Sequence, residues 1–169
     1  MIYLYHGTNA EFASPDPKRG RRGTDFGQGF YLTPNFDSAR RMAERVARRQ
    51  GTTGGVVLCY ALEDSSLSNG GLQVRTFLDI NAEWLRFVVA NRYADLSATD
   101  HNLDSRWDIV HGLVADDRVV QILDDLRRGF STEDEVLRKL RAAPFRTIQY
   151  SFHTQRAIER LCLTEVKHV

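Results

Sequence analysis

The chain has 169 residues, of which 42% are hydrophobic, and its 23 Lys and Arg against 22 Asp and Glu leave a net charge of +1. This length and apolar content predict one domain, residues 1–169, with a buried core. The near-neutral total excludes a polycation, no apolar run approaches the roughly 20 residues that cross a bilayer, and residues 1–6 lack the features of a signal peptide. We expect a cytoplasmic protein that does not enter a membrane.

The first predicted strand covers residues 2–5 and leads directly into His6-Gly7-Thr8, so position 6 is expected at a strand edge or a cleft. Residues 14–23 are rich in Pro, Gly and charge, which predicts a long loop. Long loops in small domains are often functional, and this one is a candidate lid.

Residues 26–33 predict a glycine-bent entry into a second strand. A helix from about Ser38 to Gln50 follows, capped by Asn35 or Asp37, and its apolar residues recur at helical spacing. They form a stripe that is expected to face inward. The stripe consists of Ala39, Met42, Ala43, Val46 and Ala47.

The rest of the chain mixes strand and helix patterns, which predicts a single α+β domain. Asp116-Asp117 is interpreted as a helix cap, favoured there by the helix dipole, with a catalytic carboxylate pair as the alternative. Ser131 to Asp134 open a helix with Asp in place of Glu in the capping box. Strands are expected at 56–61, 107–114 and 145–152, with a last strand that ends at about Val166. Helices are expected at 81–92, from Val119 to an end at Gly129, and at 154–161. A turn-rich stretch is expected up to Gly71 and a loop over 93–105.

The two cysteines and five histidines predict neither a disulfide nor a metal site. Cys59 and Cys162 lie in short apolar runs, where a thiol is more often a small buried hydrophobe than a disulfide partner or a nucleophile. The histidines show no metal-ligand spacing. They are His6, His101, His111, His153 and His168.

Positive charge is concentrated between Lys18 and Arg49, although the whole chain is nearly neutral. This segment has nine cations against Asp25, Asp37 and Glu44, a local net charge of +6. Such a block can attract the phosphate of a small ligand or of a nucleic acid. The alternative is a solvated helix face together with a basic loop.

Three separated segments carry residue types suited to catalysis: His6-Gly7-Thr8, Gly29 to Thr33, and Ile148 to Phe152. Each alone has an ordinary structural explanation, as a hydrogen-bonding His, a core Tyr or a surface Gln. In this order they resemble the His-Tyr-Glu class of ADP-ribosyltransferases, the class of diphtheria toxin and the poly-ADP-ribose polymerases. The resemblance implies a split β-sheet core flanked by helices, with NAD⁺ as co-substrate and no metal.

The resemblance extends over nearly the whole chain. It is most specific to a bacterial family long known as a domain of unknown function and grouped with these transferases. The segments that carry it are Tyr5 to Thr8, Asp25 to Tyr31, Trp84 to Arg92, Asp108 to Val110, Ala115 to Asp117 and Ser151 to Thr154.

Roles in this class carry over by position. The resemblance implies that His6 bonds the adenosine ribose, that Gly7 offers its backbone to the nicotinamide amide and that Tyr31 stacks on the nicotinamide ring. Arg21 and Arg22 are candidates for holding the diphosphate, and no motif decides between them. The remaining NAD-binding candidates in these motifs are Thr8, Asp25, Gly29 and Phe30.

The third motif departs from the class, because Gln149 occupies the position of the glutamate that stabilises the cationic transition state. An amide can bond a ribose hydroxyl, but it has no charge and cannot act as a base. Loss of a carboxylate about 4 Å from a positive charge costs roughly 4 kcal/mol, on the order of a thousandfold in rate. The substrate's diphosphate, Asp25 or a nucleophilic acceptor can supply part of this. Alternation predicts that Ile148, Tyr150 and Phe152 face the core and Gln149 the other way.

We therefore expect a mono-ADP-ribosyltransferase with His6, Tyr31 and Gln149 as catalytic residues. The basic block predicts an anionic acceptor, nucleic acid or protein, and the resemblance to bacterial members implies a toxin held by an antitoxin protein. Two alternatives stay open. One is an NAD⁺ glycohydrolase, in which water accepts the ribosyl cation, and the other is a silent NAD⁺-binding or interaction module.

Overall fold

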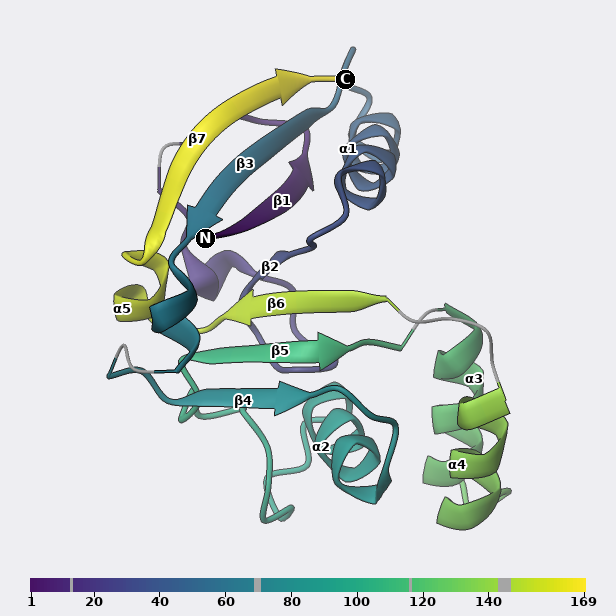
Figure 1. Ribbon diagram of the computed structural model, residues 1–169. Coiled ribbons are helices and arrows are strands. Elements are labelled where there is room, and N and C mark those ends of the chain that lie inside the picture. The colour runs from purple at the N-terminus through teal and green to yellow at the C-terminus, as the bar shows by residue number, and fades with distance from the viewer. Residues whose placement is uncertain (13, 69–70, 116, 143–146) are drawn as a thin grey trace.

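The computed structural model describes residues 1–12, 14–68, 71–115, 117–142 and 147–169. In these ranges, seven strands form two sheets, and five α-helices pack on them (Figure 1). The predicted α+β class is therefore confirmed. The first sheet is antiparallel, with the order β1-β3-β7. Its strands are β1 (Ile2–Thr8), β3 (Val56–Leu62) and β7 (Leu161–His168).

The second sheet has the order β2-β6-β5-β4, and only its β4–β5 pair is parallel. Sequence patterns did not predict β4, which has four residues and follows a turn-rich stretch. Its pairing with β5 is a long-range contact that no local pattern reveals. The strands are β2 (Phe30–Leu32), β4 (Val74–Phe77), β5 (Ile109–Leu113) and β6 (Ile148–Phe152).

Helices pack on both sheets (Figure 1). One apolar cluster combines residues of both sheets and forms the core between them. Helix α1 (Phe36–Gln50) packs on the first sheet. Three others, α2 (Ala82–Arg92), α3 (Asp117–Arg127) and α4 (Glu133–Ala142), share a core with the second sheet. The short α5 (Gln155–Ile158) precedes β7. No helix in the described part of the chain is long and apolar enough to cross a membrane.

Helix α1 begins and ends with local signals that the sequence contains. The side chain of Asn35 accepts a hydrogen bond of 2.8 Å from the backbone N–H of Ser38, and Gly51 ends the helix in the left-handed conformation at φ 67°. Ala39, Ala43 and Ala47 are buried against the sheet. The predicted stripe was too wide, because Met42 is 40% exposed and Val46 is only half-buried.

Other expectations need correction. Cys162 is exposed on β7, whereas Cys59 is buried as predicted, because Cys59 packs under α1 with Ala39 and Ala43. The capping box of α4 pairs Thr132 with Glu135, one residue later than predicted. Asp116 and the side chain of Asp117 lie outside the described residues, as does the expected start of a strand at residue 145.

Candidate functional site

The two sheets meet at one backbone bridge between β1 and the end of β2. Tyr5 and Thr33 exchange both backbone hydrogen bonds, with N···O distances of 2.9 and 3.0 Å. Past this bridge β1 continues along the first sheet while β2 pairs with β6 in the second. The imidazole of His6 bridges the start of the gap, with its Nδ1 2.8 Å from the carbonyl O of Tyr31. Strands β1 and β2 therefore separate at His6 and Tyr31, which belong to two of the three candidate segments identified from the sequence.

A cavity of about 310 Å³ occupies this separation. It brings together His6, Gly7 and Thr8 from β1, Tyr31 from β2 and Gln149 from β6. Its volume lies at the lower end of the roughly 300 to 1,000 Å³ typical of small-molecule sites. Helix α1 supplies a wall with Ser38, Ala39, Met42 and Val46, and Tyr5, Leu32, Thr33 and Thr147 complete the lining.

The free edge of β1 presents backbone hydrogen-bonding groups toward this separation. In an antiparallel pair the N–H and C=O groups of alternate residues point to the same side of the strand. Tyr5 directs both groups at Thr33, away from β3, so Gly7 directs its own groups to that side. Beyond the bridge, Gly7 therefore offers one donor and one acceptor to a ligand.

His6 is neutral and held in one orientation. Burial lowers its pKa below the ordinary histidine value. A neutral ring facing the carbonyl O of Tyr31 must donate from Nδ1–H, which leaves Nε2 as an acceptor. Phe30 packs against the ring at a centroid distance of 4.4 Å, and Phe12 lies 5.9 Å away. His6 can therefore accept a hydrogen bond from a hydroxyl.

The hydroxyl of Tyr31 is committed to the loop before β2. It donates toward Thr24 Oγ1 at 2.9 Å or the carbonyl O of Gly27 at 2.8 Å, and it accepts from the N–H of Phe26 at 3.1 Å. Burial raises the pKa of this phenol, so it stays protonated. Its ring, not its hydroxyl, is therefore the part that Tyr31 offers to the cavity.

Gln149 reaches the cavity from the neighbouring strand. It lies two residues before Ser151, which pairs with Tyr31 across β2 and β6, so Gln149 shares a sheet face with Tyr31. Tyr150 and Phe152 pack between the sheets, as alternation predicts. Ile148 instead packs with the cluster below the second sheet, which differs from the prediction.

Asp25 does not line the cavity, although it belongs to the same motif as Tyr31. It is buried, forms an ion pair with Arg92 of α2 and accepts a hydrogen bond of 2.5 Å from the N–H of Ala115. Burial raises the pKa of this carboxyl group. Asp25 thus anchors the loop that carries the partners of Tyr31.

Four further NAD-binding candidates are also outside the cavity lining. Phe30 is buried in the core between the sheets. Gly29 leaves room for His153, because an added Cβ would come within 2.7 Å of its Nδ1. Arg21 and Arg22 are exposed in the loop before Tyr31. Of the three candidate segments, the cavity is thus lined by all of the first, by Tyr31 to Thr33 of the second and by Gln149 of the third.

Sequence reasoning missed the part that α1 and Thr147 contribute. Ser38, Met42 and Val46 recur every four residues, a spacing that the sequence shows but that is equally typical of a core-facing row. Thr147 lies within the predicted strand 145–152 and gave no signal of a functional role. Among the described lining residues there is no Asp, Glu, Lys or Arg, so this part of the cavity wall has no charged side chain while His6 is neutral.

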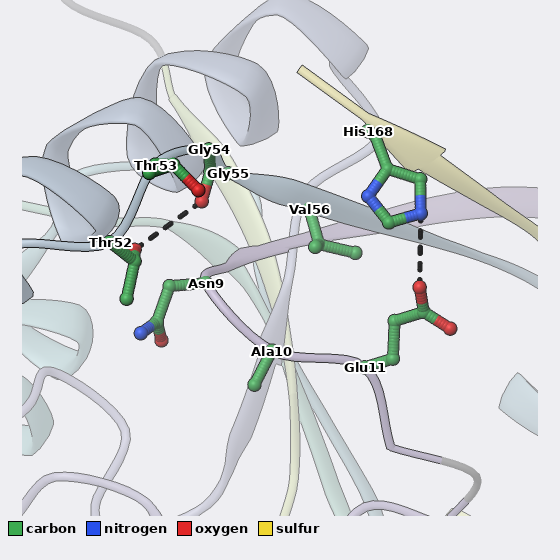
Figure 2. Close-up of a pocket in the computed structure, with 9 residues that line it drawn as sticks. All are labelled: Asn9, Ala10, Glu11, Thr52, Thr53, Gly54, Gly55, Val56 and His168. Carbon is green, nitrogen blue, oxygen red and sulfur yellow. Dashed lines mark hydrogen bonds and ion pairs between the residues drawn. The ribbon is translucent and has the colours of Figure 1, made fainter.

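A second hollow, also of about 310 Å³, adjoins the cavity along the chain, since Thr8 lines one and Asn9 the other. Figure 2 shows that the loop after β1 and the turn of residues 52–55 form its two sides. Glu11 pairs with His168 across it at 3.0 Å. We call it the groove. Within the described ranges, no group of three His, Cys, Asp or Glu side chains is placed to hold a metal ion.

Comparison with known proteins identifies a family and no activity. A family model described as a protein of unknown function (DUF3990) matches residues 2–163. No curated protein and no solved structure matches the chain.

Proposed function

The chain belongs to the DUF3990 family, and we propose that it is a mono-ADP-ribosyltransferase that uses NAD⁺ as its co-substrate. One observation carries the proposal: His6, Gly7, Tyr31 and Gln149 come from three distant segments and line one cavity. These are the residues to which the resemblance assigns NAD⁺ contacts. The family description names no activity, so the support for a transferase comes from the geometry of this chain and from that resemblance.

The cavity suits a flat cationic ring with a carboxamide. In the proposed complex, the N–H of Gly7 donates to the amide oxygen of nicotinamide, and its C=O accepts from the amide nitrogen. The ring of Tyr31 packs on the positively charged pyridinium, a favourable cation–π arrangement. Met42 gives a polarisable contact from α1. An uncharged wall avoids the repulsion that a Lys or Arg would create.

The remainder of NAD⁺ extends along β1. The Nε2 of His6 accepts from a hydroxyl of the adenosine ribose, and the groove beyond Thr8 gives room that the cavity itself lacks. Arg21 and Arg22 are exposed and carry the proposed contact with the diphosphate. Gln149 bonds the nicotinamide ribose as a neutral amide.

The proposed reaction breaks the bond between the ribose carbon and the nicotinamide nitrogen. Nicotinamide leaves with the electron pair, and a nucleophile of the acceptor forms the new bond to that carbon and releases its proton to solvent. Because no described residue of the cavity wall is a carboxylate, the diphosphate of NAD⁺ supplies the negative charge near the cationic centre in this proposal. We expect a slower reaction than with a glutamate in place of Gln149.

The proposed acceptor is an anionic macromolecule, and the proposed setting is the cytoplasm, where NAD⁺ is available and the exposed Cys162 stays reduced. The proposed biological role is that of a toxin restrained by an antitoxin protein. An NAD⁺ glycohydrolase is the second candidate, favoured because no carboxylate that could activate an acceptor nucleophile is found among the described residues of the cavity wall.

Incubation of the purified protein with NAD⁺ labelled in its adenine ring, with and without bacterial lysate, tests the proposal. A transferase places label on macromolecules and releases unlabelled nicotinamide. A glycohydrolase gives free labelled ADP-ribose in both samples, and a silent module gives neither product. A His6→Ala variant that remains folded by circular dichroism is the control, and equal labelling by this variant contradicts the proposed site.

A further inference from the structure

Helix α1 carries a row of arginines directly beside the row that lines the cavity. Side chains three residues apart on a helix are neighbours on its surface, and each arginine follows a cavity residue by three positions. The cavity row is Ser38, Met42 and Val46, and the second row, called here the arginine row, is Arg41, Arg45 and Arg49. All three arginines are exposed. The cavity wall and the arginine row are therefore adjacent strips of one helix.

The arginine row has no acidic partner among the described residues. Arg40, on another side of α1, is neutralised by Asp37 at 3.6 Å and by Glu44 at 2.9 Å. Arg41 bonds only the hydroxyl of Ser38, at 3.0 Å. Asp37 and Glu44 thus neutralise the charge of Arg40 on a different face of α1, and the face beside the cavity keeps its positive charge.

We propose that the arginine row binds single-stranded nucleic acid and delivers an unpaired nucleotide to the cavity as the acceptor. This inference rests on the proposed transferase function. Four helical residues rise about 6 Å, so the row presents three cations over about 12 Å, which suits a polymer with regularly spaced phosphates. Helix α1 contains arginine and no lysine. Guanidinium groups bind phosphates with two parallel bonds and also stack on bases.

An unpaired strand fits this site better than a duplex. A nucleophilic atom of the acceptor must reach the ribose carbon of NAD⁺ inside the separation of the sheets, and a base in a duplex is stacked and paired. Met42 is 40% exposed where the arginine row borders the cavity, and it offers an apolar contact for a base. The new bond joins a nitrogen or oxygen of that nucleotide to the ribose carbon, nicotinamide leaves, and the acceptor proton passes to solvent.

The test removes the charge of the arginine row in an Arg41→Gln, Arg45→Gln, Arg49→Gln triple variant. The matched control, Arg128→Gln, Arg138→Gln, Lys139→Gln, removes three exposed charges around α3 and α4, which lie beside the ends of the strands of the second sheet and apart from α1 (Figure 1). Fluorescence anisotropy of a labelled mixed-sequence single strand, as DNA and as RNA, gives the affinity across a range of salt concentrations.

We expect the triple variant to bind the strand at least about tenfold more weakly, because three phosphate contacts are lost. The slope of log affinity against log salt becomes shallower by about 2, since each phosphate contact on a single strand contributes about 0.7. The control variant stays within about threefold of the wild type. Equal binding by the triple variant and the wild type, or preference for duplex or for polyglutamate, overturns the proposal.

Calorimetry with NAD⁺ separates this inference from the proposed function. The triple variant is expected to bind NAD⁺ as the wild type does, because the arginine row is outside the cavity lining. A wild type that binds the strand but not NAD⁺ contradicts the transferase and leaves the docking surface in place. A wild type that binds NAD⁺ but not the strand contradicts the docking surface alone.

Discussion

Gly7 and Ala39 are in backbone contact: a Cβ atom added to Gly7 would lie 2.0 Å from the carbonyl O of Ala39 and 2.7 Å from the N of Ala43. From its sequence motif, Gly7 was expected to offer its backbone to the nicotinamide amide. The structure gives it a second task, since the absence of a side chain lets α1 pack on β1 while the backbone groups face the cavity edge.

Gly7→Ala is therefore expected to displace α1 and the cavity wall with it. The clash is with backbone atoms that no rotamer change can move, so we expect a loss of about 3 kcal/mol in unfolding free energy and loss of NAD⁺ binding. Urea denaturation and calorimetry measure the two effects. Gly54→Ala is the control for stability, because its Cβ would meet only Val169 O at 3.6 Å. A fully stable Gly7→Ala protein would show that the helix packing is not tight.

Tyr31 has two separable parts, a ring at the cavity and a hydroxyl in the loop. Tyr31→Phe keeps the ring and leaves the N–H of Phe26 without its partner, so we expect a loss of about 1–3 kcal/mol in stability. NAD⁺ affinity should change by less than about threefold, whereas Tyr31→Ala should weaken it by about tenfold or more because the ring contact is lost. Calorimetry under conditions where each variant is folded decides this. Equal weakening in both variants would assign a direct role to the hydroxyl.

Helix α1 shows most clearly which features of the fold can be predicted from the sequence. Its start at Asn35 and its end at Gly51 depend on neighbouring residues, so local signals predict them. The direction that each side of α1 faces cannot be predicted this way, because Met42 and Ala43 are both apolar and consecutive in the sequence. Only the separation of β1 from β2 decides that one is buried in the core and the other lines the cavity.

The same reasoning explains the errors at Asp25 and β4. Asp25 belongs to the motif that ends with Tyr31, but its partner Arg92 is 67 positions away, and this distant ion pair turns the carboxylate away from the cavity lining. Strand β4 is short and pairs in parallel with β5. The order of the sequence motifs therefore predicted that His6, Tyr31 and Gln149 lie close together. The position of Asp25 and the formation of β4 depend on contacts between distant segments, which the motifs do not show.

Acidification should destabilise the protein through His153. Burial lowers its pKa to about 4, and its ring lies between the carbonyl O of Gln28 at 2.9 Å and the hydroxyl of Ser151 at 2.8 Å. The unfolded histidine, with a pKa of about 6.5, takes up a proton first. Stability is therefore fully present above pH of about 6.5 and falls until pH of about 4, by up to about 3 kcal/mol from this residue.

His153→Gln removes the titrating group, so its unfolding free energy should depend less on pH than that of the wild type, even if it is lower at neutral pH. Urea denaturation at neutral and acidic pH gives the two differences, and subtracting them cancels the contribution of groups such as His6. Parallel pH profiles for the two proteins would mean that His153 does not titrate in this range.

Gln149 decides how the proposed chemistry works without a glutamate. It lines the cavity with His6 and Tyr31 and carries no charge, so it can position the ribose but cannot offset a cationic centre. Gln149→Ala should therefore slow nicotinamide release only by about threefold to tenfold, the worth of a neutral hydrogen bond of about 0.5–1.5 kcal/mol. His6→Ala and Tyr31→Ala should cost more, because they remove binding and orientation of NAD⁺.

Gln149→Glu should have the opposite effect and raise NAD⁺ hydrolysis, because a carboxylate beside the developing cation stabilises it. Nicotinamide release at saturating and at limiting NAD⁺ separates rate from binding for all four variants. The expected order of residual activity is Gln149→Glu, wild type, Gln149→Ala and then the His6 and Tyr31 variants. A Gln149→Ala protein as inactive as His6→Ala, with NAD⁺ still bound, would mean that the amide takes part in the chemical step itself and does more than position the sugar.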